Sequence, residues 1–166
     1  MYFANNRTNL YSILRRLPDA VAVVRGNEKN IEIQGTVKFY QTSSGVFVVA
    51  DVSGLPRSNG ACNSRIFAFH IHGGQGCDGN EADPFANAGS HYNPDGCPHP
   101  YHRGDMPPLF SAGGRAFLAF LTDRFTVNEV LDRMVIIHDS PDDFTTQPSG
   151  NAGNKIACGT ISKVMR

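Results

Sequence analysis

Three runs of β-branched and aromatic residues follow one another between residues 20 and 55, with only short turns between them. The runs cover residues 20–26, 31–41 and 46–55. Two parallel strands need a connection of about a dozen residues or more, and no segment of that length separates these runs. The sequence therefore predicts an antiparallel meander and argues against a parallel α/β sheet.

The rest of the chain alternates short strand-like runs with long loops. Strands are predicted at residues 66–72, 114–125, 134–138 and 155–165. Thr126 and Glu129 have the spacing of a capping box, which predicts one or two helical turns through Leu131. The segments 73–114 and 139–154 are loops of a length that is uncommon in compact domains unless they carry function or are disordered. Together these elements favour an antiparallel sandwich or a flattened barrel.

The first 19 residues carry a helical pattern instead. The apolar residues that recur at helical spacing are Leu10, Ile13, Leu14 and Leu17. Thr8 can cap such a helix, and Pro18 cannot continue it. We expect an N-terminal helical extension over residues 1–19, packed on the domain or on a partner subunit, and one β-barrel domain over residues 20–166.

The composition describes an ordinary globular domain rather than a disordered or fibrous chain. Hydrophobic residues make up 40% and charged residues 18% of the 166 residues, which suits one domain with its own core. The formal net charge is +0, and no apolar run approaches the roughly 20 residues of a membrane-spanning helix. We therefore expect neither a nucleic-acid partner nor a membrane partner.

Compartment and cysteine pairing stay open at this point. The N-terminus lacks the apolar segment and cleavage site of a signal peptide, which favours the cytoplasm, or the periplasm or cell exterior if a leader has been removed. The four cysteines permit three pairings, and their number cannot choose among them. Oxidised cysteines would favour an exported protein.

Five of the six histidines lie between residues 66 and 105. His70 and His72 are two apart in a predicted strand, so both side chains point to the same face. Two histidines could simply occupy a solvated face, but more ligand-type residues follow: His91, His99, His102 and Asp105. Three imidazoles with one carboxylate suit tetrahedral Zn²⁺, and imidazoles without thiolate suit Cu(II). The spacing alone predicts one or two transition-metal ions.

Six segments, in this order, resemble the copper,zinc superoxide dismutase family over roughly residues 20–164. They are FHIHG, GQGC, AGSHYNP, HRGDMP, VIIHDSPDD and GNAGNKIACGTI. The resemblance implies an all-β fold, an antiparallel Greek-key sandwich or flattened eight-stranded barrel with two long loops. It also implies an oxidoreductase with copper and zinc as cofactors, the superoxide anion as substrate, and a possible homodimer.

The resemblance implies a ligand role for every histidine. The copper ligands would be His70, His72, His91 and His138. The zinc ligands would be His91, His99, His102 and Asp105. His91 would be an imidazolate shared by both ions and would carry a proton while copper cycles between two oxidation states. Zinc would stay redox-inert and structural.

The resemblance extends to residues around the ions. Asp142 matches a carboxylate that links a copper-ligand and a zinc-ligand histidine, although it could also be a solvated loop acid. Cys77 and Cys158 match an intramolecular disulfide. Cys62 and Cys97 lie outside the common pattern and would form a second bridge or remain two thiols.

Three features depart from the family pattern. Only two residues separate His99 from His102, and the loop over residues 142–150 is short. Lys155 stands where the family usually has an arginine. An ammonium attracts superoxide as a point charge but lacks the planar fork of a guanidinium, so we expect activity to be kept but reduced. Ser149 could narrow the entrance beside Lys155 or serve only as a turn residue.

Two other functions stay open. A copper carrier or zinc-stabilised module on the same fold would keep the ligands without catalysis, because a fold does not fix a function. A zinc hydrolase would need an open coordination position and a general base, and no H-E-x-x-H motif is present. The sequence favours the dismutase, with a non-catalytic copper- or zinc-binding protein as the alternative.

Overall fold

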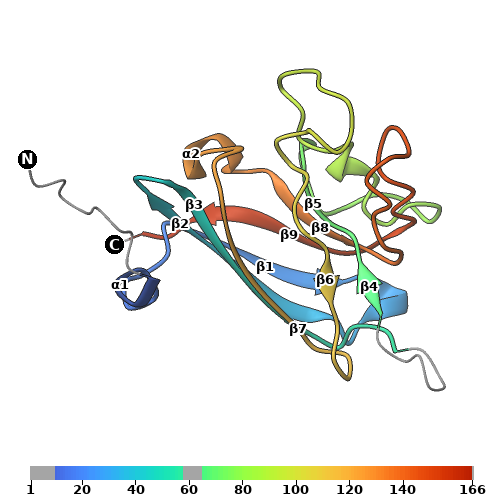
Figure 1. Cartoon of the computed structure of the whole chain (residues 1–166). Helices are drawn as coiled ribbons and strands as arrows, with labels where there is room; N and C mark the ends of the chain where they lie inside the picture. The colour runs from blue at the N-terminus through green and yellow to red at the C-terminus, as the bar shows by residue number, and fades with distance from the viewer. Residues whose placement is uncertain (1–9, 58–64, 166) are drawn as a thin grey trace, which may run out of the picture.

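One antiparallel sheet, curled around an apolar core, organises the chain (Figure 1). The computed structural model describes residues 10–57 and 65–165. The strands of this sheet are, in spatial order, β5 (Phe69–His72), β8 (Met134–His138), β9 (Lys155–Lys163), β1 (Ala20–Gly26), β2 (Gln34–Thr42), β3 (Gly45–Ser53) and β7 (Ala116–Thr122). The all-β antiparallel fold is therefore confirmed.

A second, two-stranded sheet completes the core. It pairs β4 (Ile66–Phe67) with β6 (Leu109–Phe110), and Phe67 and Leu109 are fully buried in the main core. The remaining elements are α1 (Leu10–Leu14), α2 (Val127–Val130) and the 3-10 turns η1 (Glu28–Asn30) and η2 (Ala86–Ala88). None of the helices that the structure describes is long and apolar enough to span a membrane.

Alternation of side chains along the meander builds the core. In β1, Ala22 and Val24 are fully buried, while Val23 between them is 51% exposed. In β2, Val37 and Phe39 are fully buried in the same way. Residues two apart on a strand share a face, so each strand turns one apolar row inward. The antiparallel pairing of β1 with β2 and of β2 with β3 confirms the predicted meander.

The strand predicted over residues 31–41 begins later than expected, at Gln34. The side chain of Asn27 caps η1 by accepting from Lys29 N at 3.1 Å, and Ile31 then lies on the surface, 79% exposed. The loop predicted over residues 73–114 also contains β6, which pairs only at two residues.

The strand predicted over residues 66–72 is interrupted at Ala68, which separates β4 from β5. Ala68 N donates to Ser140 O at 2.8 Å, and His138 N donates to Ala68 O at 2.9 Å. Both bonds run to the end of β8 and the start of its loop, so the chain leaves one sheet and enters the other at this residue.

The N-terminal helix α1 lies on the outer face of the sheet. Ile13 is 7% exposed and packs against Tyr40 and Phe47, whereas Leu17 is 60% exposed. Only part of the predicted apolar stripe therefore packs on the domain. The predicted Thr8 cap lies outside the described residues, and the division of the chain at residue 19 stays a prediction.

The helix α2 begins with the predicted capping box, since Glu129 N donates to Thr126 Oγ1 and Thr126 N donates to Glu129 Oε2. The Glu129 carboxylate also pairs with Arg103 in the loop that follows β5. The capping box therefore orients a carboxylate that ties α2 to this loop.

Truncation of Phe39 tests the inward row of β2. Phe39 is fully buried and meets Phe125 edge-to-face with ring centroids 6.4 Å apart. Phe39→Ala should lower the free energy of unfolding by ~3–5 kcal/mol. The matched control Phe117→Ala removes a ring that is 67% exposed and should change it by less than about 0.5 kcal/mol. Urea unfolding of the two variants with the disulfide intact measures both, and equal losses would contradict the assignment of the core face.

Candidate metal centre

β5 is an edge strand, and the long loop that follows it pairs with its free side. Tyr92 N donates to Ile71 O, and Ile71 N donates to Gly104 O, both at 2.8 Å. Ile71 is buried in the main core. Its neighbours His70 and His72 therefore point to the opposite face of the sheet, beneath this loop.

The same pairing brings distant ligand-type residues to β5. Isolated bridges join His72 to His91 and His70 to Asp105. His138 arrives from the other side, at the end of β8, where the pairing with β9 shifts register. The residues that meet here are each at most 8% exposed: His70, His72, His91, His99, His102, Asp105 and His138.

One set of four imidazoles converges on a single point. This first cluster consists of His70, His72, His91 and His138, with one nitrogen from each lying within 4.8 Å of the others. The Nε2 atoms of His72 and His138 are 3.3 Å apart. His70 Nδ1 and His91 Nε2 are buried and have no hydrogen-bond partner in the part of the chain that the structure describes. Buried polar atoms are nearly always paired, so these two nitrogens suit a metal ion.

The outer nitrogens of this cluster are held by the protein. His72 Nδ1 lies 2.8 Å from Gly89 O, and His138 Nδ1 lies 3.2 Å from Gly153 O. A carbonyl oxygen can only accept, so each Nδ1 carries the proton and each Nε2 keeps a lone pair for a ligand.

A second cluster adjoins the first and shares one residue with it. It consists of His91, His99, His102 and Asp105, whose ligand atoms also lie within 4.8 Å of one another. Asp105 Oδ1 is 2.7 Å from His91 Nδ1, and Asp105 Oδ2 is 3.1 Å from His99 Nδ1 and 3.3 Å from His102 Nδ1. Three imidazoles and one carboxylate are a donor set that suits tetrahedral Zn²⁺. His91 faces this cluster through Nδ1 and leaves Nε2 for the first.

Asp142 links the two clusters by hydrogen bonds. Its Oδ2 accepts from His70 Nε2 at 2.8 Å, and its Oδ1 accepts from His99 Nε2 at 2.9 Å. Burial raises the pKa of Asp142, but the hydrogen bonds from His70, Phe144 N and His99 outweigh it and lower this pKa to about 2. An ionised Asp142 fixes a proton on both Nε2 atoms, so both Nδ1 atoms are free to ligate.

The loop over residues 142–150 folds closely over this carboxylate. A Cβ on Gly150, which has a φ of +66°, would lie 1.9 Å from Asp142 Oδ1 and 2.7 Å from His99 Nε2. Gln147 brackets His99 from the same loop by accepting from its N–H at 2.9 Å and donating to its carbonyl at 2.7 Å. The close approach at Gly150 and the two hydrogen bonds of Gln147 explain why so short a loop can hold His99 in place.

The short turn between His99 and His102 is held by Arg124, which sequence reasoning missed. Arg124 Nη1 lies 2.8 Å from Pro100 O and 3.2 Å from the carbonyl oxygens of His102 and Asp105. Nothing in the local sequence indicates this contact, since it joins the end of β7 to a turn 22 residues earlier. The turn keeps all four ligand atoms of the second cluster together.

Burial keeps the imidazoles of His72 and His138 neutral. Burial and the neighbouring imidazole of His70 lower the pKa of His138 to about 3. Burial and the imidazoles of His138 and His91 hold the pKa of His72 well below its ordinary value. Metal ions bind the neutral imidazole, so the protein presents these ligands ready for an ion at neutral pH.

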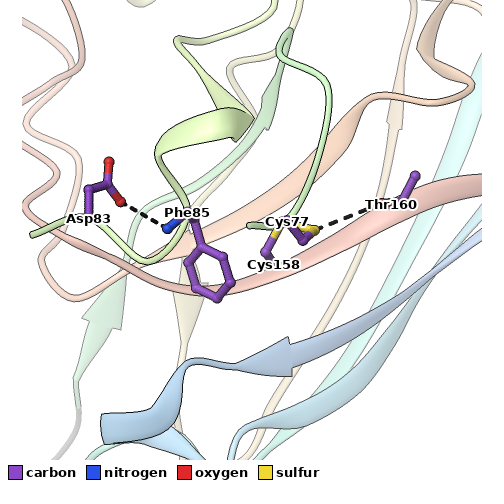
Figure 2. Close-up of a disulfide and its surroundings, with 5 residues drawn as sticks. All are labelled: Cys77, Asp83, Phe85, Cys158 and Thr160. Atoms are coloured by element: carbon purple, nitrogen blue, oxygen red, sulfur yellow. Dashed lines mark hydrogen bonds between the residues drawn. A yellow bond between two sulfur atoms is a disulfide. The ribbon is translucent and has the colours of Figure 1, made fainter. Parts of the chain in front are cut away.

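The predicted disulfide between Cys77 and Cys158 is confirmed, with a Cα–Cα distance of 5.6 Å (Figure 2). It fastens the loop after β5 to β9. Cys97 is half-buried and has no disulfide partner among the described residues. Cys62 lies outside the described residues, so the second bridge stays a prediction.

A cavity of about 620 Å³ opens beside the first cluster. The predicted site residues that line it are His72, His91, His102, His138, Ser149 and Lys155. The Lys155 ammonium forms an ion pair with Asp83, which sequence reasoning also missed. The anion-guiding role of Lys155 and the narrowing role of Ser149 stay predictions.

Comparisons with known proteins agree on one family. The model of the copper/zinc superoxide dismutase family matches residues 33–161. Cu-Zn superoxide dismutase 2 of Aquifex aeolicus is 32% identical over 145 residues, covering 78% of this chain and 80% of its own. The copper chaperone for superoxide dismutase of Rattus norvegicus is 28% identical over 166 residues, covering 92% of this chain and 56% of its own. The Cu/Zn superoxide dismutase structure from Brucella abortus superposes with a TM-score of 0.72 at 22% identity, covering 86% of this chain and 99% of that one.

Replacing Asp142 tests the link between the clusters. Asp142→Asn removes the anion that fixes the protons on His70 and His99, and we expect Zn²⁺ affinity to fall about 10- to 100-fold. Asp143→Asn is the control, because Asp143 is exposed and its side-chain hydrogen bonds among the described residues stay within its own loop, to Thr145 and Thr146. Competition with a chromophoric chelator measures both affinities. Equal affinity in the two variants would contradict the linking role.

The buried imidazoles also predict how the stability of the metal-free protein depends on pH. The pKa of His138 is about 3 in the folded chain against 6.5 without the fold, so the unfolded chain binds more protons between these values. The free energy of unfolding should therefore fall as pH drops below about 6.5, by up to ~1.4 kcal/mol per pH unit for this group. Urea unfolding at a series of pH values measures the slope. His138→Gln should flatten it, and an equally steep slope in that variant would contradict the assignment.

Proposed function

The chain belongs to the copper/zinc superoxide dismutase family, and we propose that it converts two superoxide anions and two protons into dioxygen and hydrogen peroxide. The observation that carries the proposal is the pair of buried four-ligand clusters that share His91. The first cluster would hold copper through His70, His72, His91 and His138. The second would hold zinc through His91, His99, His102 and Asp105.

The donor sets fit these ions. His70 Nδ1, His91 Nε2 and His99 Nδ1 are buried, make no hydrogen bond among the described residues, and each points into a cluster. Asp105 Oδ2 lies 3.1 Å from His99 Nδ1, but neither atom carries a proton to donate because the proton of His99 is on Nε2. When bound, copper supplies one-electron redox chemistry and zinc supplies a fixed positive charge without redox change. Both ions are implied by the family and by the donor atoms.

His91 is the residue best placed to move a proton. Its Nδ1 is fixed 2.7 Å from Asp105 Oδ1, which leaves Nε2 directed at the first cluster. His91 would hold a proton at Nε2 and give it to the reduced oxygen species that leaves as hydrogen peroxide. Lys155 at the wall of the cavity would hold the incoming anion beside the first cluster.

The alternative is a non-catalytic copper- or zinc-binding protein on the same fold. The similarity to the rat copper chaperone for superoxide dismutase favours it, although the chain spans only 56% of that relative. The completeness of the first cluster favours the dismutase instead, because a catalyst needs every one of these ligands.

Superoxide decay separates the two functions. The protein loaded with copper and zinc should accelerate the decay, and His138→Ala should reduce it to the background rate, because one of four copper ligands is lost. Metal content is measured on both samples. A protein that binds both ions yet leaves the decay at background would contradict the dismutase and support the alternative.

A further inference from the structure

The cation at the cavity wall is not free. Lys155 Nζ forms an ion pair with Asp83 Oδ2, and the Lys155 side chain is only 15% exposed. We propose that Asp83 determines how strongly this site attracts anions, because it neutralises the lysine that faces the first cluster. The inference rests on the proposed function for the role of Lys155 and for copper in that cluster.

The loop after β5 fixes the position of the Asp83 carboxylate. Phe85 N donates to Asp83 Oδ1 at 3.1 Å (Figure 2). This leaves Asp83 Oδ2 for the lysine. The backbone is held as well, since Asp83 N donates to Asn80 Oδ1 and Asp83 O accepts from Asn80 N and Ala86 N, each at 3.0 Å. The hydrogen bonds that hold this turn do not involve Lys155, so the turn positions the carboxylate independently of the lysine.

A covalent bond and an apolar cluster place this turn against β9. Cys77 of the loop is bonded to Cys158, which lies three residues beyond Lys155 on β9. Phe85 is 7% exposed and packs with Met134, Ile136 and Cys158 (Figure 2 shows Phe85 beside the disulfide). Because the two sides of the ion pair are joined this way, the pair is a fixed feature of the cavity.

The charges around the cavity leave no surplus of positive charge. Its lining contains two lysines, Lys29 and Lys155, against three carboxylates, Glu81, Asp83 and Asp139. Burial raises the pKa of Asp83, but hydrogen bonds from Lys155 and Phe85 N outweigh it and lower this pKa, so Asp83 is ionised at neutral pH. Steering of an anion depends on the summed potential at the entrance. Removing the carboxylate that is paired with Lys155 should therefore raise this potential more than removing an unpaired one.

Azide binding tests the inference without turnover. Azide is a small anion that ligates copper, and its affinity for the copper- and zinc-loaded protein can be followed by the visible absorption of copper. At low ionic strength, Asp83→Asn should tighten azide binding roughly two- to fivefold, and added salt should shrink the difference.

A matched variant and a second background make the test specific. Glu81→Gln removes the same charge from the same cavity, but Glu81 is exposed and has no ion-pair partner among the described residues. Its effect should be smaller. In a Lys155→Gln background, the effect of Asp83→Asn should shrink to that of Glu81→Gln, because no lysine is left to release toward the anion.

A readout on the metal-free protein is independent of copper. Acetylation by acetic anhydride, mapped by peptide mass spectrometry, should be faster at Lys155 in Asp83→Asn than in the parent, with the exposed Lys29 as internal reference. Equal azide effects from Asp83→Asn and Glu81→Gln, or an Asp83→Asn effect that is undiminished without Lys155, would overturn the inference. If azide binds to the variants as expected but the copper- and zinc-loaded protein does not accelerate superoxide decay, only the proposed function is contradicted.

Discussion

The site depends on the backbone hydrogen bonds that a long loop makes to the free edge of β5. Tyr92 N donates to the carbonyl oxygen of Ile71, and the amide of Ile71 donates to Gly104 O. Without these bonds, both backbone groups of Ile71 would be unpaired on a sheet edge. These two bonds set His91 and Asp105 beside the H-x-H pair of the strand. The same hydrogen bonds therefore cover the edge strand and bring the candidate ligands together.

Burial of six imidazoles has a consequence for the metal-free chain. Ionised Asp142 and two carbonyl oxygens satisfy the outer nitrogens, but His70 Nδ1, His91 Nε2 and His99 Nδ1 keep no partner among the described residues. Unsatisfied buried nitrogens destabilise the fold, and ligation of a metal ion removes that cost. Metal binding should thus stabilise the two loops as well as supply chemistry.

The sequence predicts the fold where the signal is local and periodic. Runs of β-branched and aromatic residues identified β1, most of β2, and β3, and the capping box identified α2, because neighbours in sequence decide these elements. The interruption at Ala68 was missed because it depends on hydrogen bonds to Ser140 and His138, about 70 residues away. The pattern of apolar residues at 66–72 does not indicate those hydrogen bonds.

The same distinction applies to the site. The histidines and Asp105 are visible in the sequence because their own side chains carry the atoms that could bind a metal ion. Arg124 and Asp83 act instead by contact with a distant segment, at sequence separations of 22 and 72 residues. An arginine or aspartate in a loop does not indicate from the sequence which distant residue it contacts.

Asp83 also changes what a net charge of +0 implies for this chain. The loop over residues 142–150 carries no lysine or arginine, so attraction of an anion depends on the few cations at the cavity wall. The disulfide-linked loop pairs a carboxylate, that of Asp83, with one of them, Lys155. We therefore infer that one loop and β9 determine the local field at the first cluster, and that the total charge of the chain says little about it.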